Sequence, residues 1–161
     1  HAAAWAPKSN VELKAAIAQC LQQSDFDCTK GPRGPIGSWD VTGVTDMRQL
    51  CYSATSFNGD LSNWDVSKVT RMDNMFRDAS SFNGDLSKWV VSKVTDMQSM
   101  FRGASSFNQP LSAWDVSSVT KMNLMFSSAS SFNQPLSTWV VSSVTNMQYM
   151  FKSASSFKPL S

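Results

Sequence analysis

Five tryptophans recur at one position of the sequence, and indole rings are its most obvious binding chemistry. They are Trp39, Trp64, Trp89, Trp114 and Trp139. An exposed row of indoles would form an apolar platform for sugar rings or for a partner's side chains. The alternative is that the indoles fill the interior and donate their Nε1–H groups to the backbone. We favour packing, and we keep Trp64, Trp89, Trp114 and Trp139 as candidate ligand-binding residues.

Polar residues beside the tryptophans form a second candidate set: Asn63, Asp65, Lys88 and Asp115. The position after each tryptophan holds either Asp or Val, as Asp65 and Val90 illustrate, and a position that accepts both is typical of the surface. Asp65 and Asp115 lie two repeats apart, roughly 10 Å at the spacing of paired strands. That distance is too long for the two carboxylates to share one metal ion. We therefore predict no metal site and no cofactor.

Catalytic motifs are missing from the sequence. The only histidine is His1, the only glutamate is Glu12, and there is no CxxC pair, HExxH motif or phosphate-binding glycine loop. A formal net charge of +2 is too small to indicate a nucleic acid or an anionic membrane as the partner. We predict that the protein is not an enzyme, binds no nucleic acid and does not insert into a membrane.

A repeat of 25 residues positions all of these side chains. Full copies occupy residues 57–81, 82–106, 107–131 and 132–156, a partial copy occupies 37–56, and 157–161 begin another. A strict period of this length predicts a solenoid of stacked coils. Within each coil, the Trp/Val alternation indicates a short strand. The later apolar residues, spaced three and four apart, indicate a short helix or 3-10 turn. We predict an α/β solenoid with parallel strands.

Residues 1–36 are expected to cap this solenoid, because the end of its first coil would otherwise expose apolar surface. Ser9 and Glu12 fit a capping box at the start of a helix over 9–23. The predicted apolar face of that helix consists of Val11, Ala15, Ile17, Ala18 and Leu21. We divide the chain into a cap, 1–36, and a repeat domain, 37–161, with coils starting near 37, 57, 82, 107 and 132.

The three cysteines are Cys20, Cys28 and Cys51. Cys20 and Cys28 could close a short disulfide loop in an oxidising compartment, but either of them could also pair with Cys51. Cys51 occupies the column that holds phenylalanine in later coils, so we predict that it is a small buried residue.

The repeat resembles a known family most clearly in FNGDLSKWVVSKVTDMQSMFRGASS, residues 82–106. Its pattern, F-N-x-x-L-S-x-W-x-V-S-x-V-T-x-M-x-x-M-F-x-x-A-S-S, is similar to the BspA-type surface-protein repeat, also called the DUF285 or Mycoplasma-lipoprotein repeat. The resemblance covers residues 37–161. It implies a leucine-rich-repeat-like solenoid with right-handed coils on secreted or cell-surface proteins, often associated with adhesion. It supplies no catalytic residues and no single ligand.

We therefore expect a non-catalytic recognition or adhesion module that binds a protein or a glycan, and we expect it to be part of a longer exported, extracellular or cell-surface protein. The first alternative is a structural spacer or assembly element that self-associates through an open C-terminal end. The second is ice or mineral-surface binding by the threonine column.

Overall fold

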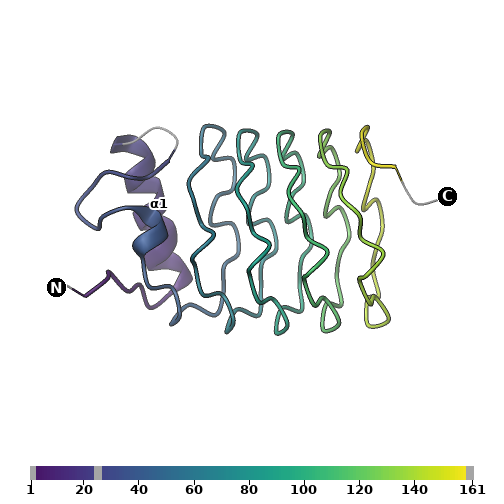
Figure 1. Ribbon diagram of the computed structural model, residues 1–161, viewed down its shortest axis with the longest axis horizontal. Helices are drawn as coiled ribbons and strands as arrows, with labels where there is room; N and C mark the ends of the chain where they lie inside the picture. Colours follow the sequence, from purple (N-terminus) through teal and green to yellow (C-terminus); the bar gives the residue numbers. More distant parts are fainter. Residues whose placement is uncertain (1–2, 24–26, 159–161) are drawn as a thin grey trace.

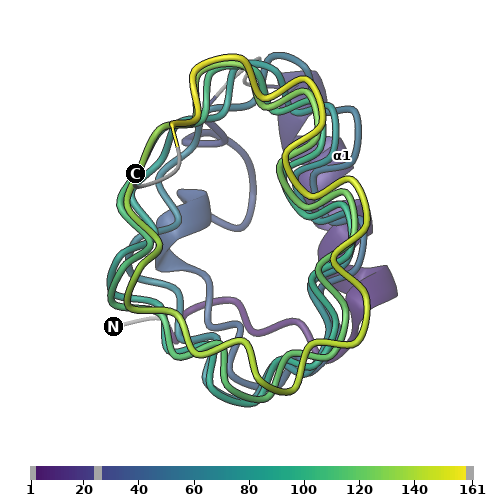
Figure 2. The same cartoon turned by 90° about the vertical axis from the view of Figure 1, so that its right-hand side faces the viewer.

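The computed structural model describes residues 3–23 and 27–158 as a stack of coils closed at one end by a helix (Figure 1). That helix is α1, Asn10–Gln23, and a 3-10 helix, η1, spans Ile36–Ser38. Isolated parallel bridges connect successive coils at one column: Asp46 to Arg71, Arg71 to Asp96, Asp96 to Lys121 and Lys121 to Asn146. Viewed from the C-terminal end, the coils superimpose on one closed outline (Figure 2).

The prediction of an α/β, leucine-rich-repeat-like solenoid with right-handed coils is wrong. Within the described residues, the coils consist of turns and irregular segments with isolated bridges, without a sheet and without an α-helix.

The backbone hydrogen bonds explain why the apolar stripe after residue 69 is not a helix. The amides of Met72, Asn74, Phe76 and Asp78 donate to carbonyls of the next coil, whereas those of Met75, Arg77 and Ala79 donate three residues back within the same coil. Equivalent rings of Phe76 and Phe101 have centroids 5.6 Å apart, whereas packed helices need about 8–10 Å. The coil spacing therefore favours turns that share their amides with the neighbouring coil.

Phenylalanine rings from equivalent positions stack through the interior. Phe57, Phe82, Phe107 and Phe132 form one column with centroids 5.8–6.0 Å apart. Phe76, Phe101 and Phe126 form a second column. All seven rings are fully buried. The two columns touch, since the centroids of Phe76 and Phe82 are 4.2 Å apart, so stacking and burial act along and across the coils.

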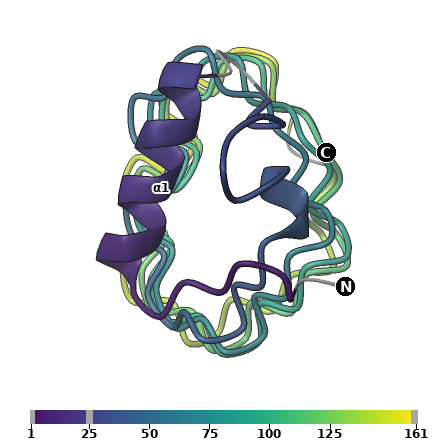
Figure 3. The same cartoon turned by 90° about the vertical axis from the view of Figure 1, so that its left-hand side faces the viewer.

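Helix α1 lies at the N-terminal end of the stack, along one side of the outline that the coils form (Figure 3). Its buried residues are Leu13, Ala16, Ile17 and Cys20. Of the predicted apolar face, Ile17 is buried and Leu21 is partly buried against the core. The prediction is wrong for Val11, Ala15 and Ala18, which are exposed, Val11 by 77%. Two inward anchors decide the rotation of the helix: Cys20 is tied into the interior by a disulfide, and Leu13 packs against the core.

The start of α1 follows the predicted capping box, except that one hydrogen bond involves a different residue. The Ser9 hydroxyl accepts the amide of Glu12 at 3.1 Å, as expected for an N-cap. The Glu12 carboxylate accepts the amide of Lys8 at 3.2 Å, rather than that of Ser9. The helix thus begins where the sequence indicates.

Asn10 lets α1 take the place of a missing coil. In later coils, carbonyls such as that of Arg71 accept an amide of the preceding coil, here that of Met47, at 2.9 Å. In the coil 37–56, the Asn10 side-chain amide donates instead to the carbonyls of Asp46 and Arg48, at 3.1 and 2.9 Å. The cap therefore satisfies backbone acceptors that would otherwise lose their protein donors. The domain boundary at 36/37 stays a prediction.

Candidate functional site

The tryptophan column lies inside the stack. Trp64, Trp89 and Trp114 are 3% exposed and Trp139 is 9% exposed. The indoles of Trp89 and Trp114 are parallel, with centroids 6.5 Å apart. Their Nε1–H groups donate at 2.9 Å to the carbonyls of Leu61 and Leu86 in the preceding coils. These four candidate ligand residues are therefore packing residues, because a ligand has no access to their ring faces.

The residues immediately before and after each tryptophan point outward. They are Asn63, Lys88, Ala113 and Thr138 before it, and Asp40, Asp65, Val90, Asp115 and Val140 after it, and all are exposed. They flank buried tryptophans at equivalent positions of successive coils, so we group these exposed side chains as one surface. We call it the variable face, because its residue types change from coil to coil. It contains the four polar candidates of the sequence: Asn63, Asp65, Lys88 and Asp115.

The aspartates of the variable face each stabilise the turn that follows them. Asp65 accepts the amide of Ser67 at 3.0 Å and its hydroxyl at 2.6 Å. Asp115 accepts the same two groups of Ser117 at 3.0 and 2.6 Å. The hydroxyl bond first, and then the amide bond, lower the pKa of each carboxyl below its ordinary value. Both side chains are therefore negatively charged at neutral pH.

The valines of the variable face have no such role. Val90 is 56% exposed and Val140 is 58% exposed. Among the described residues, Ser92 and Ser142, two residues further on, donate no hydrogen bond to the protein. Each valine thus exposes apolar surface where other coils stabilise a turn. The sequence placed this column on the surface but did not mark the valines as candidates, although the alternation of Asp and Val was the available signal.

Columns with one residue type serve stacking instead. The Oγ1–H groups of Thr70, Thr95, Thr120 and Thr145 donate to the carbonyl of the preceding threonine at 3.1–3.3 Å. The Oδ1 atoms of Asn58, Asn83 and Asn108 each accept an amide of the next coil at 2.9 Å. The residue type at these positions is therefore the same in successive coils because each side chain makes the same hydrogen bond to a neighbouring coil.

Charged residues on another part of the surface pair with one another. Arg71 contacts Asp73 at 3.1 Å and Asp96, in the next coil, at 3.7 Å. The Arg71 side chain is 40% exposed, whereas those of Asp73 and Asp96 are only 11% and 14% exposed. Lys88, by contrast, has no ion pair within the part of the chain that the structure describes.

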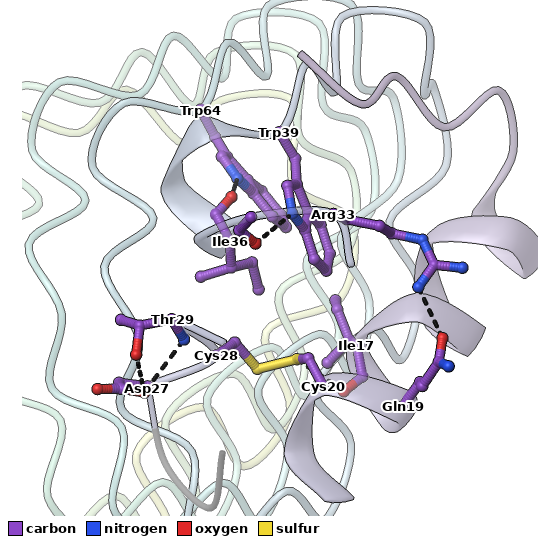
Figure 4. Close-up of a disulfide and its surroundings, with 11 residues drawn as sticks. Ile17, Gln19, Cys20, Asp27, Cys28, Thr29, Arg33, Ile36, Trp39 and Trp64 are labelled. Atoms are coloured by element: carbon purple, nitrogen blue, oxygen red, sulfur yellow. Dashed lines mark hydrogen bonds between the residues drawn. A yellow bond between two sulfur atoms is a disulfide. The ribbon is translucent and has the colours of Figure 1, made fainter. Parts of the chain in front are cut away.

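Cys20 and Cys28 form a disulfide that ties α1 to the loop before η1 (Figure 4). Their Cα atoms are 5.2 Å apart. Cys51 remains a buried free thiol, and burial raises its pKa to about 12. The pairing that the sequence left open is thus Cys20 with Cys28, and Cys51 has no thiolate available for chemistry at neutral pH.

Residues 3–23 and 27–158 lack both a cluster of metal ligands and a membrane-spanning helix. They contain no group of three or more His, Cys, Asp or Glu side chains arranged to hold a metal ion. No helix in these ranges has the length and apolar character needed to cross a membrane.

The stacked coils and the columns on their surface define a repeat protein, and the comparisons place it in a family. A family model described as "Mycoplasma protein of unknown function, DUF285" matches residues 21–114 and again 87–161. The chain therefore belongs to the DUF285 family, which confirms the resemblance of its repeat. That description assigns neither an activity nor a ligand. No curated protein and no solved structure matches the chain.

Proposed function

We propose that this chain is a non-catalytic recognition module of a surface or secreted protein, with an adhesive role, and that its variable face binds a protein partner. The exposure of Val90 and Val140 carries this proposal. A single exposed valine is ordinary. Here, however, valine stands where Asp65 and Asp115 stabilise a turn, so it gives up hydrogen bonds without gaining packing. Binding to a partner would explain what folding does not.

A protein partner suits this surface better than a glycan. The indoles that would stack on sugar rings are buried. The variable face instead offers valine methyl groups beside charged Asp65, Lys88 and Asp115. A mixture of apolar and charged groups is typical of protein–protein contacts, where complementary charges set the orientation of the partner.

The disulfide supports a location outside the cell. Cys20 and Cys28 are bonded, and disulfides persist mainly in oxidising compartments. The resemblance to surface-protein repeats points the same way, and the extracellular or cell-surface location remains part of the proposal.

A spacer is the second candidate, because the interior columns of phenylalanine and tryptophan make every coil adhere to the next. Self-association of such a spacer belongs to this alternative. Ice or mineral binding has less support, since the threonine hydroxyls are committed to backbone carbonyls.

A binding screen tests the proposal against immobilised extracellular-matrix proteins and polysaccharides. The variant Val90→Asp should abolish saturable binding to a protein, because it places a charge in the contact. The matched control is Ser106→Asp, which adds the same charge at an exposed position elsewhere in the same coil and should bind normally. A wild-type chain that binds no protein, or a Val90→Asp variant that binds normally, would favour the spacer.

A further inference from the structure

A pocket of about 340 Å³ lies where the cap meets the coil 57–81. Its floor is largely apolar and is formed by Pro35, Ile36 and Gly37. Asp27, Asn58 and Asp60 contribute polar groups to its lining. The volume is in the range of small ligand sites, and the combination of an apolar floor with two aspartates gives the pocket a definite chemical preference.

Close backbone contacts hold together the segments that line this pocket. The amide of Ile36 donates to the carbonyl of Cys28 at 2.9 Å, and Cys28 is held by its disulfide to α1. A Cβ atom at Gly59 would lie 2.9 Å from the Asp27 carbonyl, and one at Gly37 would lie 2.9 Å from the Asp60 carbonyl. These glycines let the cap loop, η1 and the coil approach closely, so the pocket is built into the fold.

The pocket carries negative charge. Within the described residues, Asp60 forms no ion pair with a lysine or arginine. Asp60 accepts the hydroxyl and the amide of Ser62, at 2.6 and 2.9 Å, and these bonds lower its pKa below the ordinary value. Asp85, at the same position of the next coil, interacts electrostatically with Asp60 but does not line the pocket.

Arg33, a basic residue of the same turn segment, is engaged elsewhere. It donates to the Gln19 side chain at 2.6 Å (Figure 4), and its guanidinium lies 4.7 Å from the centroid of the Trp5 ring. Arg33 forms no ion pair with Asp60.

We propose that this pocket accepts an arginine or lysine side chain of a partner protein. The aliphatic stem would cover Pro35, Ile36 and Gly37, since long basic side chains bury their methylene groups while the charged end stays polar. The cationic end would meet the carboxylates of Asp27 and Asp60, and hydrogen bonds between charged groups are the strongest of their kind. Val90 does not line this pocket, so the contact at Val90 and the pocket can fail independently.

Nuclear magnetic resonance titration of the isotopically labelled chain with acetyl-Ala-Arg-Ala-amide and acetyl-Ala-Lys-Ala-amide tests this proposal. At least one peptide should shift the amide signals of Ile36, Gly37 and Ser38 saturably. The neutral citrulline analogue of the arginine peptide should bind at least about tenfold more weakly, since it lacks the charge.

Asp60→Asn is the test variant, because asparagine keeps an oxygen for Ser62 but removes the charge. We expect it to weaken peptide binding about tenfold. Asp85→Asn, the matched change one coil away, and Val90→Asp, on the variable face, should bind as the wild type does.

Three results would overturn the proposal. One is the absence of a saturable shift with either basic peptide, and another is equal binding of the citrulline peptide. The third is an equal loss in Asp60→Asn and Asp85→Asn, which would indicate diffuse attraction to the acidic edge. Glucosamine that produces the same shifts while the peptides do not would assign the pocket to an amino sugar and reject the basic side chain.

Discussion

The cap and the coil stack supply hydrogen-bond partners to backbone groups of the neighbouring coil in different ways. In the stack, the repeat supplies every contact again, as when the amide of each threonine from Thr70 to Thr145 donates to the carbonyl of the threonine one coil earlier. In the cap, single residues do this work: Asn10 donates to two carbonyls, and the Trp5 carbonyl accepts the amide of Asp40 at 2.8 Å. The stack therefore depends on contacts that recur in every coil, whereas the cap depends on individual contacts that occur once.

The largest effect should come from breaking an interior column. Trp114→Ala removes a buried side chain and leaves the Leu86 carbonyl without its indole donor. We expect it to lower the free energy of unfolding by about 3–5 kcal/mol, measured by chemical denaturation. The neighbouring exposed residue gives the control, Ala113→Ser, which should change stability little. A loss below about 1 kcal/mol in Trp114→Ala would contradict the interior role of this column.

Removal of the disulfide should have the next largest effect and should act at the cap. The bond joins residues eight apart in sequence, and a short loop of this kind contributes about 2 kcal/mol. The double variant Cys20→Ser/Cys28→Ser should melt at a lower temperature and lose amide-exchange protection first in α1. An unchanged melting curve, or equal loss of protection throughout the coils, would show that the cap does not depend on this bond.

Variants of Asn10 test whether one side chain can supply the hydrogen bonds that a preceding coil would otherwise donate. Asn10→Ala removes the donor to two carbonyls and should destabilise the chain by about 1 kcal/mol in chemical denaturation. Asn10→Asp should destabilise it more, because a carboxylate would face the carbonyl oxygens of Asp46 and Arg48. If Asn10→Asp were as stable as the wild type, the inferred donor role would be wrong.

Val90→Asp compares coils within the stack, because it gives coil 82–106 the aspartate that Asp65 and Asp115 provide in the adjacent coils. The new carboxylate should accept the amide and hydroxyl of Ser92, as Asp65 does with Ser67. We expect a gain of about 0.5 kcal/mol in the free energy of unfolding, together with the loss of binding proposed above. The reverse change, Asp65→Val, should lower the free energy of unfolding by a similar amount. If both variants were stabilised, or both destabilised, the proposed role of these aspartates in stability would be wrong.

The smallest effect should be a dependence on pH. The folded pKa of Asp65 is depressed by its bonds to Ser67, so its contribution to stability is present above the unfolded value, about 3.9. That contribution is lost as the pH falls through the lower folded value. Melting temperatures between neutral and strongly acidic pH should therefore fall less steeply for Asp65→Asn than for the wild type. Parallel curves would show that these bonds do not affect the ionisation of Asp65.

Parts of the site could be predicted because they follow from the repeat. The variation between Asp and Val placed their column on the surface, where Asp65 and Val90 are exposed. The indole column had two possible positions, because an indole suits either an interior or a binding platform. Its burial depends on the backbone carbonyls of the preceding coil, such as that of Leu61, which the residue pattern does not locate.

The apolar face of α1 shows a different limit of sequence patterns. Both Val11 with Ala15 and Leu13 with Ile17 fit helical spacing, so periodicity alone allowed two rotations of the helix. The disulfide at Cys20 and the contact of Asn10 with the first coil select the second rotation. Contacts that occur once in the molecule made that choice.

The 25-residue period, the N-cap of α1 at Ser9 and the column that varies among the coils all follow from the order of the residues. These features depend on local residue types and on repetition, which are visible in one dimension. By contrast, the construction of the coils from turns, the burial of the indoles and the pocket beside Asp60 became visible in the folded chain. Each of these depends on which groups of neighbouring coils, or of the cap, lie close enough to bond. Apolar spacing marks the residues to be buried, but the distance between coils decides where the backbone amides find their acceptors.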